Sequence, residues 1–373
     1  MRAYVLTDAS LKQQAGRFVW LSIDTEKEKN AAFLAKYPIE VWPTLMVVDA
    51  AHEQAVLRWP GSVNAAQLVK LLDDGERAAR GGGDAAAGLA ALARADRLDA
   101  EGKKREAAAA YRAALPGLPA DKRPRAIESL LAALMMAHDA DGCAQAGVEL
   151  VPAMPRGPSF ANAVSIALGC AGEEKGDARA RSLATLEPLG DEAVKLPGLL
   201  ADDRSGLYET MVDLRGQAGD GAGKKALAAR WLGFLEGEAA RASAPEQRAA
   251  FDPHRVAAAL ALGEPLRAEA ALKQSERDLP ADYNPPARLA SVYRAAGRYD
   301  DALAEVERAL GKVYGPRALR LYDLKADVQL KKGDRAGAKK TLEQALAIAR
   351  ALPVEQRRDE NVAAIDKKLH AVP

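Results

Sequence analysis

The sequence predicts a small α/β domain followed by a much longer all-α domain of repeated helix pairs, so the chain is mostly α-helical overall. Short apolar runs rich in β-forming residues alternate with amphipathic stretches in the first eighty residues. Ala, Leu, Glu, Lys and Arg dominate long tracts of the chain, and aromatic residues make up only 5%. Glycines recur at intervals of 34 and 36 residues near the C-terminus, which is typical of helical repeats.

Length and charge narrow the class of function. A chain of 373 residues exceeds what one hydrophobic core usually serves, so two domains or a repeat array are expected. The 53 Lys and Arg nearly cancel the 52 Asp and Glu, which argues against nucleic acid or anionic lipid as a partner. The longest apolar runs are shorter than the roughly 20 residues that span a bilayer. We therefore predict a soluble protein without a membrane span, whose partners are proteins or peptides.

The first eighty residues contain five predicted elements. Residues 17–24 (RFVWLSID) form a compact apolar run that predicts a buried strand. Residues 30–37 predict a short helix that is capped by Asn30 and ends before a proline. Residues 43–50 and 55–62 predict two more strands. An amphipathic helix, opened by Ser62 or Asn64, completes the domain.

This order resembles the thioredoxin fold from the end of its first long helix onward. FVWLSIDTE resembles the strand after the active-site helix, and VWPT resembles the loop that carries a cis-proline, here Pro43. The resemblance implies a cis Trp42–Pro43 bond, a peptide-binding role for both residues, and a place in redox homeostasis. The alternative is a proline at the first position of an ordinary strand, where its missing N–H costs nothing.

The chain departs from that family because it lacks both the CxxC motif and the strand before it. Three explanations stay open: a start codon placed too late, a truncated relic without redox function, and a coincidental likeness. Without the central strand, residues 1–80 are expected to fold poorly alone. The N-terminus has no signal-peptide pattern, which predicts a cytoplasmic protein as written, or a periplasmic or secreted one if an upstream signal is missing.

A Gly-rich break at residues 80–88 (RGGGDAAAG) predicts the boundary between domains 1–80 and 81–373. The GGGD within it lacks the Lys-Ser/Thr of a phosphate-binding loop and is interpreted as a hinge.

A helix-turn-helix pattern recurs after that break. In each copy a glycine is followed five residues later by alanine, and in three copies another alanine stands seven residues before the glycine. This resembles tetratricopeptide repeats, in which the glycine ends the first helix and the small alanine permits close helix packing. Weaker copies are expected near Gly142 and Gly221, and none can be phased between residues 152 and 197. An unrelated helical bundle is the alternative. The alanines expected at helix crossings are Ala95, Ala107, Ala268, Ala290, Ala302, Ala326 and Ala338.

Arrays of this kind form a superhelix whose concave side is lined by the first helix of each pair. In the last two repeats this face is expected to carry both charge signs, which suits an extended peptide or a partner helix. An ordinary solvated face is the alternative for any single residue. The predicted peptide-binding residues are Asn284, Ser291, Arg294, Arg320, Asp323 and Asp327.

Few residues favour catalysis. The four histidines are scattered without ligand spacing, so neither a metal site nor a cofactor is predicted. Cys143 and Cys170 flank a predicted helix hairpin at similar distances from its turn, which permits a disulfide. Two buried thiols are the alternative.

We predict a non-redox protein-interaction scaffold without catalytic residues. The alternative is a thiol-disulfide oxidoreductase whose CxxC lies upstream of Met1 and whose repeats bind clients. No oligomeric state is predicted.

Overall fold

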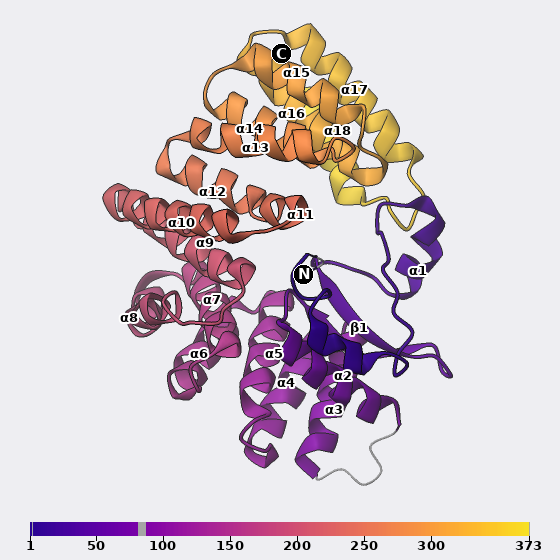
Figure 1. Cartoon of the computed structure of the whole chain (residues 1–373), viewed down its shortest axis with the longest axis vertical. Helices are drawn as coiled ribbons and strands as arrows, with labels where there is room; N and C mark the ends of the chain where they lie inside the picture. The colour runs from indigo at the N-terminus through magenta and orange to yellow at the C-terminus, as the bar shows by residue number, and fades with distance from the viewer. Residues whose placement is uncertain (2, 81–86, 373) are drawn as a thin grey trace. The chain divides into compact units, whose positions relative to one another are not determined.

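The computed structural model describes residues 1, 3–80 and 87–372 (Figure 1). The chain divides into two compact units. The first comprises residues 1–18 and 40–227, and the second comprises residues 19–39 and 228–373. A short N-terminal segment therefore belongs to the same unit as the C-terminal helices. None of the described helices combines the length and the apolar character needed to cross a bilayer.

A two-stranded antiparallel hairpin lies near the N-terminus of the first unit. Its strands are β1 (Thr44–Asp49) and β2 (Gln54–Pro60), in the places where the sequence predicts them. Leu45 pairs with Trp59 and Val47 with Leu57, and the register shifts by a bulge after Val47. These four side chains lie on one face and contribute to one hydrophobic core, as the period-two pattern of a half-buried strand requires.

Helix α2 (Ala65–Ala79) covers this hairpin. Asn64 opens it with a capping box: its side chain accepts from the Gln67 N–H at 2.8 Å, and the Gln67 side chain accepts from the Asn64 N–H at 3.0 Å. A Cβ on Gly75 would lie 2.6 Å from a methyl of Val47, so only glycine permits this approach of helix to strand. The buried core of the hairpin region consists of Val5, Leu57, Trp59, Val63, Leu68, Leu71 and Leu72.

The predicted strand at residues 17–24 is wrong, and no thioredoxin-like fold is present in the described residues. This stretch has no strand geometry, and the only sheet described there is the hairpin. Val19 and Leu21 are 88% and 72% exposed. A strand needs a neighbouring strand for its N–H and C=O groups, and the described residues place no strand beside this run, whereas β1 pairs with β2.

Two local predictions in this region are confirmed and one is wrong. The Trp42–Pro43 bond is cis, and residues 30–37 contain helix α1 (Ala31–Lys36), which follows the short η2 (Glu28–Asn30). The Asn30 side chain does not cap α1. Its amide instead donates to the Asp24 carbonyl at 2.7 Å, because the preceding turn brings that acceptor within reach.

The remainder of the first unit is helical, and consecutive helices pack against each other (Figure 1). The predicted domain boundary falls inside this unit, where residues 81–86 lie outside the described part of the chain, and it stays a prediction. The elements besides β1, β2 and α2 are η1 (Ala9–Gln14), α3 (Ala87–Ala100), α4 (Lys104–Ala114), η3 (Leu115–Gly117), α5 (Arg123–Met136), α6 (Ala140–Leu150), η4 (Val151–Ala153), α7 (Pro158–Glu173), α8 (Gly176–Ala193) and α9 (Ala201–Gln217).

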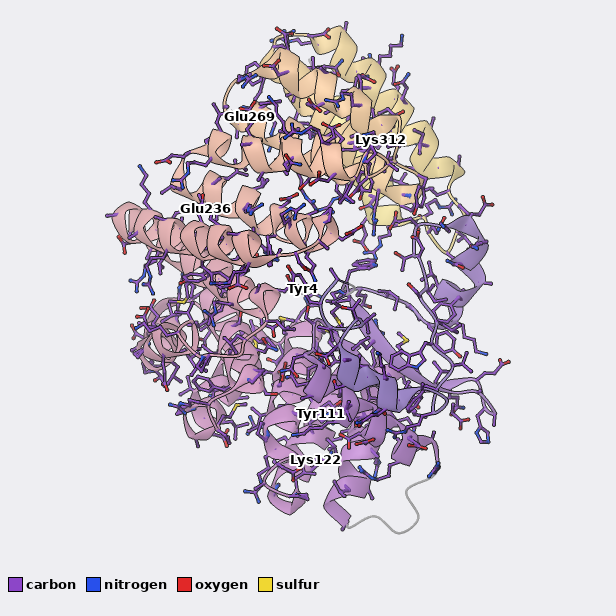
Figure 2. All side chains as sticks on the ribbon, in the orientation of Figure 1. Tyr4, Tyr111, Lys122, Glu236, Glu269 and Lys312 are labelled. Atoms are coloured by element: carbon purple, nitrogen blue, oxygen red, sulfur yellow. A yellow bond between two sulfur atoms is a disulfide. The ribbon has the colours of Figure 1, made fainter. Side chains whose placement is uncertain are left out.

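A buried polar cluster connects three of these helices. Arg125 on α5 donates through Nη2 to both carboxylate oxygens of Asp96 on α3, each at 2.8 Å. Tyr111 on α4, labelled in Figure 2, donates its hydroxyl to the same carboxylate at 2.7 Å. Asp96 and Tyr111 are almost fully buried. The cluster therefore places a charged pair in the interior, where each charge depends on its partner.

The second unit continues the pattern of helix pairs. Figure 1 shows its helices side by side in chain order toward the C-terminus. The elements after α10 (Gly221–Arg241) are α11 (Pro245–Ala249), α12 (Asp252–Leu262), η5 (Pro265–Ala268), α13 (Glu269–Asp278), α14 (Asn284–Ala295), α15 (Tyr299–Leu310), η6 (Gly315–Arg317), α16 (Ala318–Lys331), α17 (Arg335–Ala351) and α18 (Asp359–Ala371).

The turn glycines and crossing alanines lie where the repeat pattern predicts them. Gly102, Gly263, Gly297 and Gly333 all have positive φ, between 74° and 84°, at the ends of helices. The weaker copies also turn as expected, although His138, with φ of 57°, takes the left-handed position near Gly142. Each of the seven predicted crossing alanines is at most 1% exposed.

Replacing Ala302 with leucine tests this packing. Ala302 is fully buried between Leu289, Tyr293 and Val328, so the added carbon atoms have no space. We expect a loss of roughly 1–3 kcal/mol in the free energy of unfolding, measured by chemical denaturation. Ala304→Leu on the exposed side of the same helix is the matched control. Equal stabilities of the two variants would contradict the repeat register.

Candidate functional site

A chain of ion pairs connects the first helices of consecutive pairs in the second unit. Arg294 on α14 lies 3.4 Å from Asp327 on α16, measured from Nη1 to Oδ2. Lys368 on α18 places its Nζ 2.5 Å from the other oxygen of Asp327 and 2.5 Å from Oδ1 of Asp323. The three helices thus present alternating charge along one continuous face, which we call the ion-pair face.

Helical spacing explains why these groups meet. Asp323 and Asp327 are four residues apart on α16, and Arg320 precedes Asp323 by three, so all three share one side of that helix. The three helices α14, α16 and α18 are separated by one helix each, so they take the same place in consecutive helix pairs. Equivalent sides of the three helices therefore face the same way.

The groups of the ion-pair face are partly exposed. The side chains of Arg294, Asp323, Asp327 and Lys368 expose between 28% and 50% of their surface. Pairs of this kind contribute about 0–1 kcal/mol each. The stability of the fold therefore depends little on these ion pairs. A charged group of a ligand can take the place of one member of a pair at a small cost in free energy.

Lys368 is the most enclosed of these groups. Burial by itself would lower the pKa of its ammonium group, but the hydrogen bonds to Asp323 and Asp327 outweigh burial and raise the pKa. Lys368 therefore stays charged at neutral pH. Lys368 is not among the site residues predicted from the sequence. The signal available was an amphipathic stretch after the last repeat, at the place where the first helix of another pair would stand.

The structure brings together three of the predicted site residues and gives the others different settings. Asn284 donates both its backbone N–H and its side-chain amide to Asp282, at 2.9 and 2.7 Å, and so fixes the start of α14. Ser291 donates to the Ala287 carbonyl within its own helix. Arg320 is exposed and has no ion pair among the described residues, which leaves its charge available.

Trp42 and Pro43 belong to the first compact unit and not to the unit of the ion-pair face. The Trp42 side chain is half exposed. The Pro43 carbonyl accepts a hydrogen bond from the Gly61 N–H at 2.8 Å, which extends the hairpin by one bond beyond Thr44 and Pro60. This carbonyl is thus already engaged, and a peptide-binding role for the two residues stays a prediction.

A known family matches most of the helices that carry the ion-pair face. The model of the family described as tetratricopeptide repeat matches residues 283–351, which span α14 to α17. This chain contains tetratricopeptide repeats. The comparisons give no support for a thioredoxin-like domain, and no curated protein matches the chain.

Solved structures show similar helical repeats. A tetratricopeptide repeat protein from Parabacteroides merdae is 13% identical over 74% of this chain and 97% of its own, with a TM-score of 0.44. A thermophilic repeat protein in Thermus thermophilus is 20% identical over 65% of this chain and all of its own, at 0.32. The assembly chaperone of RpL4 is 14% identical over 76% of this chain and 96% of its own, with a TM-score of 0.39. These TM-scores are all below 0.5, so the assignment to tetratricopeptide repeats rests on the family model that matches residues 283–351.

The two cysteines join neighbouring helices of the first unit. Cys143 on α6 and Cys170 on α7 form a disulfide, with Cα atoms 5.9 Å apart. Both residues are at most 3% exposed. The sequence contains no other cysteine, so thiol exchange has no accessible sulfur nucleophile within this sequence. Among the described residues, no three His, Cys, Asp or Glu side chains gather where they could hold a metal ion.

The first unit also contains a cavity of ≈ 300 Å³ between α2, α5 and the start of α7. Trp59 and Phe160 line it together with several cations. Two of these cations are already paired: Lys122, labelled in Figure 2, lies 2.7 Å from Asp74, and Arg156 lies 2.7 Å from Glu192. The ion-pair face, with the free charge of Arg320, is therefore the better candidate for recognition.

Proposed function

We propose that this chain is a protein-interaction scaffold whose C-terminal repeats bind a partner peptide or helix across the ion-pair face. Tetratricopeptide repeats bind proteins or peptides, and the observation that carries the proposal is the partly exposed row of Arg294, Asp327 and Lys368. Arg320 adds a positive charge beside it. A ligand that carries both charge signs can place an opposite charge beside each of these side chains. Such charge complementarity favours one register of binding over others.

A selection on the full-length chain tests this. Peptides of about 12 residues displayed on phage are selected for binding, and the dissociation constant of each selected peptide is then measured on variants. Arg294→Glu combined with Arg320→Glu reverses two charges of the ion-pair face. We expect this variant to weaken binding at least about tenfold, or 1.4 kcal/mol, because an acidic group of the peptide then meets a negative charge.

The matched control reverses two charges on the opposite helix of the same repeat. Lys339→Glu with Lys340→Glu changes exposed residues of α17 and is expected to leave the affinity within about twofold. Circular dichroism verifies that both variants are folded. If the two double variants weaken binding equally, binding follows net charge and the ion-pair face is not the site.

A further inference from the structure

The second unit holds a segment of its own chain that comes from far away in the sequence. Residues 19–39 join a unit otherwise built from residues 228–373. The contacts concentrate on the stretch Asp24–Thr25–Glu26. The Tyr314 hydroxyl donates to Asp24 at 2.5 Å, and the Gln356 amide donates to the Thr25 carbonyl at 3.1 Å. An irregular segment is thus held by specific polar contacts and not by strand pairing.

Glu26 makes the most enclosed of these contacts. Only 9% of the residue is exposed. One carboxylate oxygen accepts from the backbone N–H of Arg317 at 3.0 Å, and the other lies 3.3 Å from Nε of the same residue. Arg317 belongs to η6, which runs directly into α16. The carboxylate there meets the Arg317 N–H, the positive end of the α16 dipole and a guanidinium together.

Asp24 shapes the segment and binds at the same time. One of its oxygens accepts from the Glu26 N–H at 3.0 Å, which closes a tight turn, while the other accepts from Tyr314. Burial by itself would raise the pKa of Asp24, but these hydrogen bonds and nearby cations lower it. Asp24 therefore binds as a carboxylate at neutral pH.

Gly315 shows that the surface is shaped for backbone contact. Its φ is +66°, and a Cβ at this position would lie 2.4 Å from the carbonyl oxygen of Glu26. Any larger residue would push the segment away. Gln356, whose side-chain amide donates to the Thr25 carbonyl, is 8% exposed with the segment in place.

The segment leaves part of this surface unfilled. A cavity of ≈ 610 Å³ borders residues 26–29 and is lined on the other side by Ile348, Leu352 and Pro353. The flanking residues Val19 and Leu21 are exposed and add little apolar burial. Attachment thus depends largely on polar contacts, which a competing peptide can replace.

We infer that Tyr314, Gly315, Arg317 and Gln356 form a second peptide-binding site, which takes a short acidic turn of the type Asp-x-Glu. In this structure the site is occupied by Asp24–Thr25–Glu26 of the same chain. A partner peptide with the same acidic pattern displaces that segment, and its apolar flank enters the cavity beside Leu352. The inference does not rest on the ion-pair face.

Emptying the site in the full-length chain tests the inference. The probe is a fluorescent peptide of residues 21–32 of this sequence. The attached segment competes at high effective concentration, so the unaltered chain should bind the probe weakly. Asp24→Ala with Glu26→Ala should bind it at least tenfold more tightly. A probe with Asn and Gln in place of Asp24 and Glu26 should not bind the emptied chain.

Adding Arg317→Glu and Tyr314→Phe to the emptied chain should abolish binding, whereas Arg294→Glu with Arg320→Glu should leave it unchanged. The second comparison separates this site from the ion-pair face. Amide exchange reports folding independently: the Arg317 N–H should lose protection when the site is emptied and regain it with the probe. Equal binding of the acidic and amide probes, or protection of Arg317 that does not respond, would overturn the inference.

Discussion

Replacing Arg125 with methionine is expected to lower the free energy of unfolding of the first compact unit by roughly 3–5 kcal/mol. The change removes both 2.8 Å hydrogen bonds from Asp96, which keeps only the hydroxyl of Tyr111. Asp96 is 2% exposed, so its charge would be left without a partner or would have to be protonated. Urea denaturation followed by circular dichroism measures the loss.

The charge state of the pair supports this expectation. Burial by itself would lower the pKa of Arg125, but the negative charges of Asp96 and Asp74 outweigh it and raise the pKa. Burial also raises the pKa of the Asp96 carboxyl, which by itself would favour its neutral form. Nη2 of Arg125 donates to both carboxylate oxygens of Asp96 at 2.8 Å, a distance typical of charge-assisted hydrogen bonds. We therefore assign a charge to both groups.

Arg112→Met is the matched control, because Arg112 pairs with Glu149 at 2.7 Å while both side chains stay about half exposed. Its loss should be below about 1 kcal/mol. Adding Asp96→Asn to Arg125→Met should recover a large part of the stability by removing the stranded charge. A cost of Arg125→Met no greater than that of the control would show that the buried pair is not needed.

Replacing Glu128 with glutamine is expected to stabilise the protein at alkaline pH by up to about 5 kcal/mol. Burial raises the pKa of Glu128 from 4.5 to about 8, against hydrogen bonds from Ser159 and Asn162 that lower it. The neighbouring carboxyl of Asp203 raises it further, and Arg125 lowers it. The folded state thus holds a proton that the unfolded chain releases.

The direction of the pH dependence follows from that proton. Below pH 4.5 the carboxyl is neutral in both states, and its effect on stability is constant. Between pH 4.5 and about 8 the unfolded chain loses the proton first, so stability falls as pH rises. Glutamine is neutral throughout. The difference in stability between variant and parent should therefore be small at pH 5 and largest near pH 9.

Denaturation of both proteins at the two pH values measures this difference. Glu106→Gln, on the exposed side of α4, is the control and should show no such pH dependence. If Glu128→Gln destabilised the protein at pH 9, the carboxylate would be stabilised by its neighbours and the raised pKa would be refuted.

The elements that could be predicted from the sequence are those with complete local signals. The α2 helix needs only Asn64 and Gln67 to close its capping box, and each repeat needs a glycine that adopts positive φ followed by an alanine small enough for a helix crossing. These requirements lie within a few residues of each other along the chain, so no knowledge of distant contacts is needed to recognise them.

The run RFVWLSID shows where local signals fail. Its composition favours a strand, but strand formation depends on the packing and pairing that a neighbouring strand supplies, and the described residues place no strand beside it. Its last residue, Asp24, and the two residues that follow it bind instead to Tyr314, Arg317 and Gln356, about three hundred positions away. Nothing in the spacing of either stretch indicates this pairing.

The sequence by itself determined the predominance of helices, the turn glycines, the crossing alanines and the side of α16 that carries Asp323 and Asp327, because backbone preference and helical period act locally. Only the tertiary structure decided that Lys368 completes the ion-pair face, that Arg125 meets Asp96, and that Glu26 accepts from the Arg317 N–H at the start of α16. Charged groups from separate elements pair according to distance and burial, and both are set by how the helices pack.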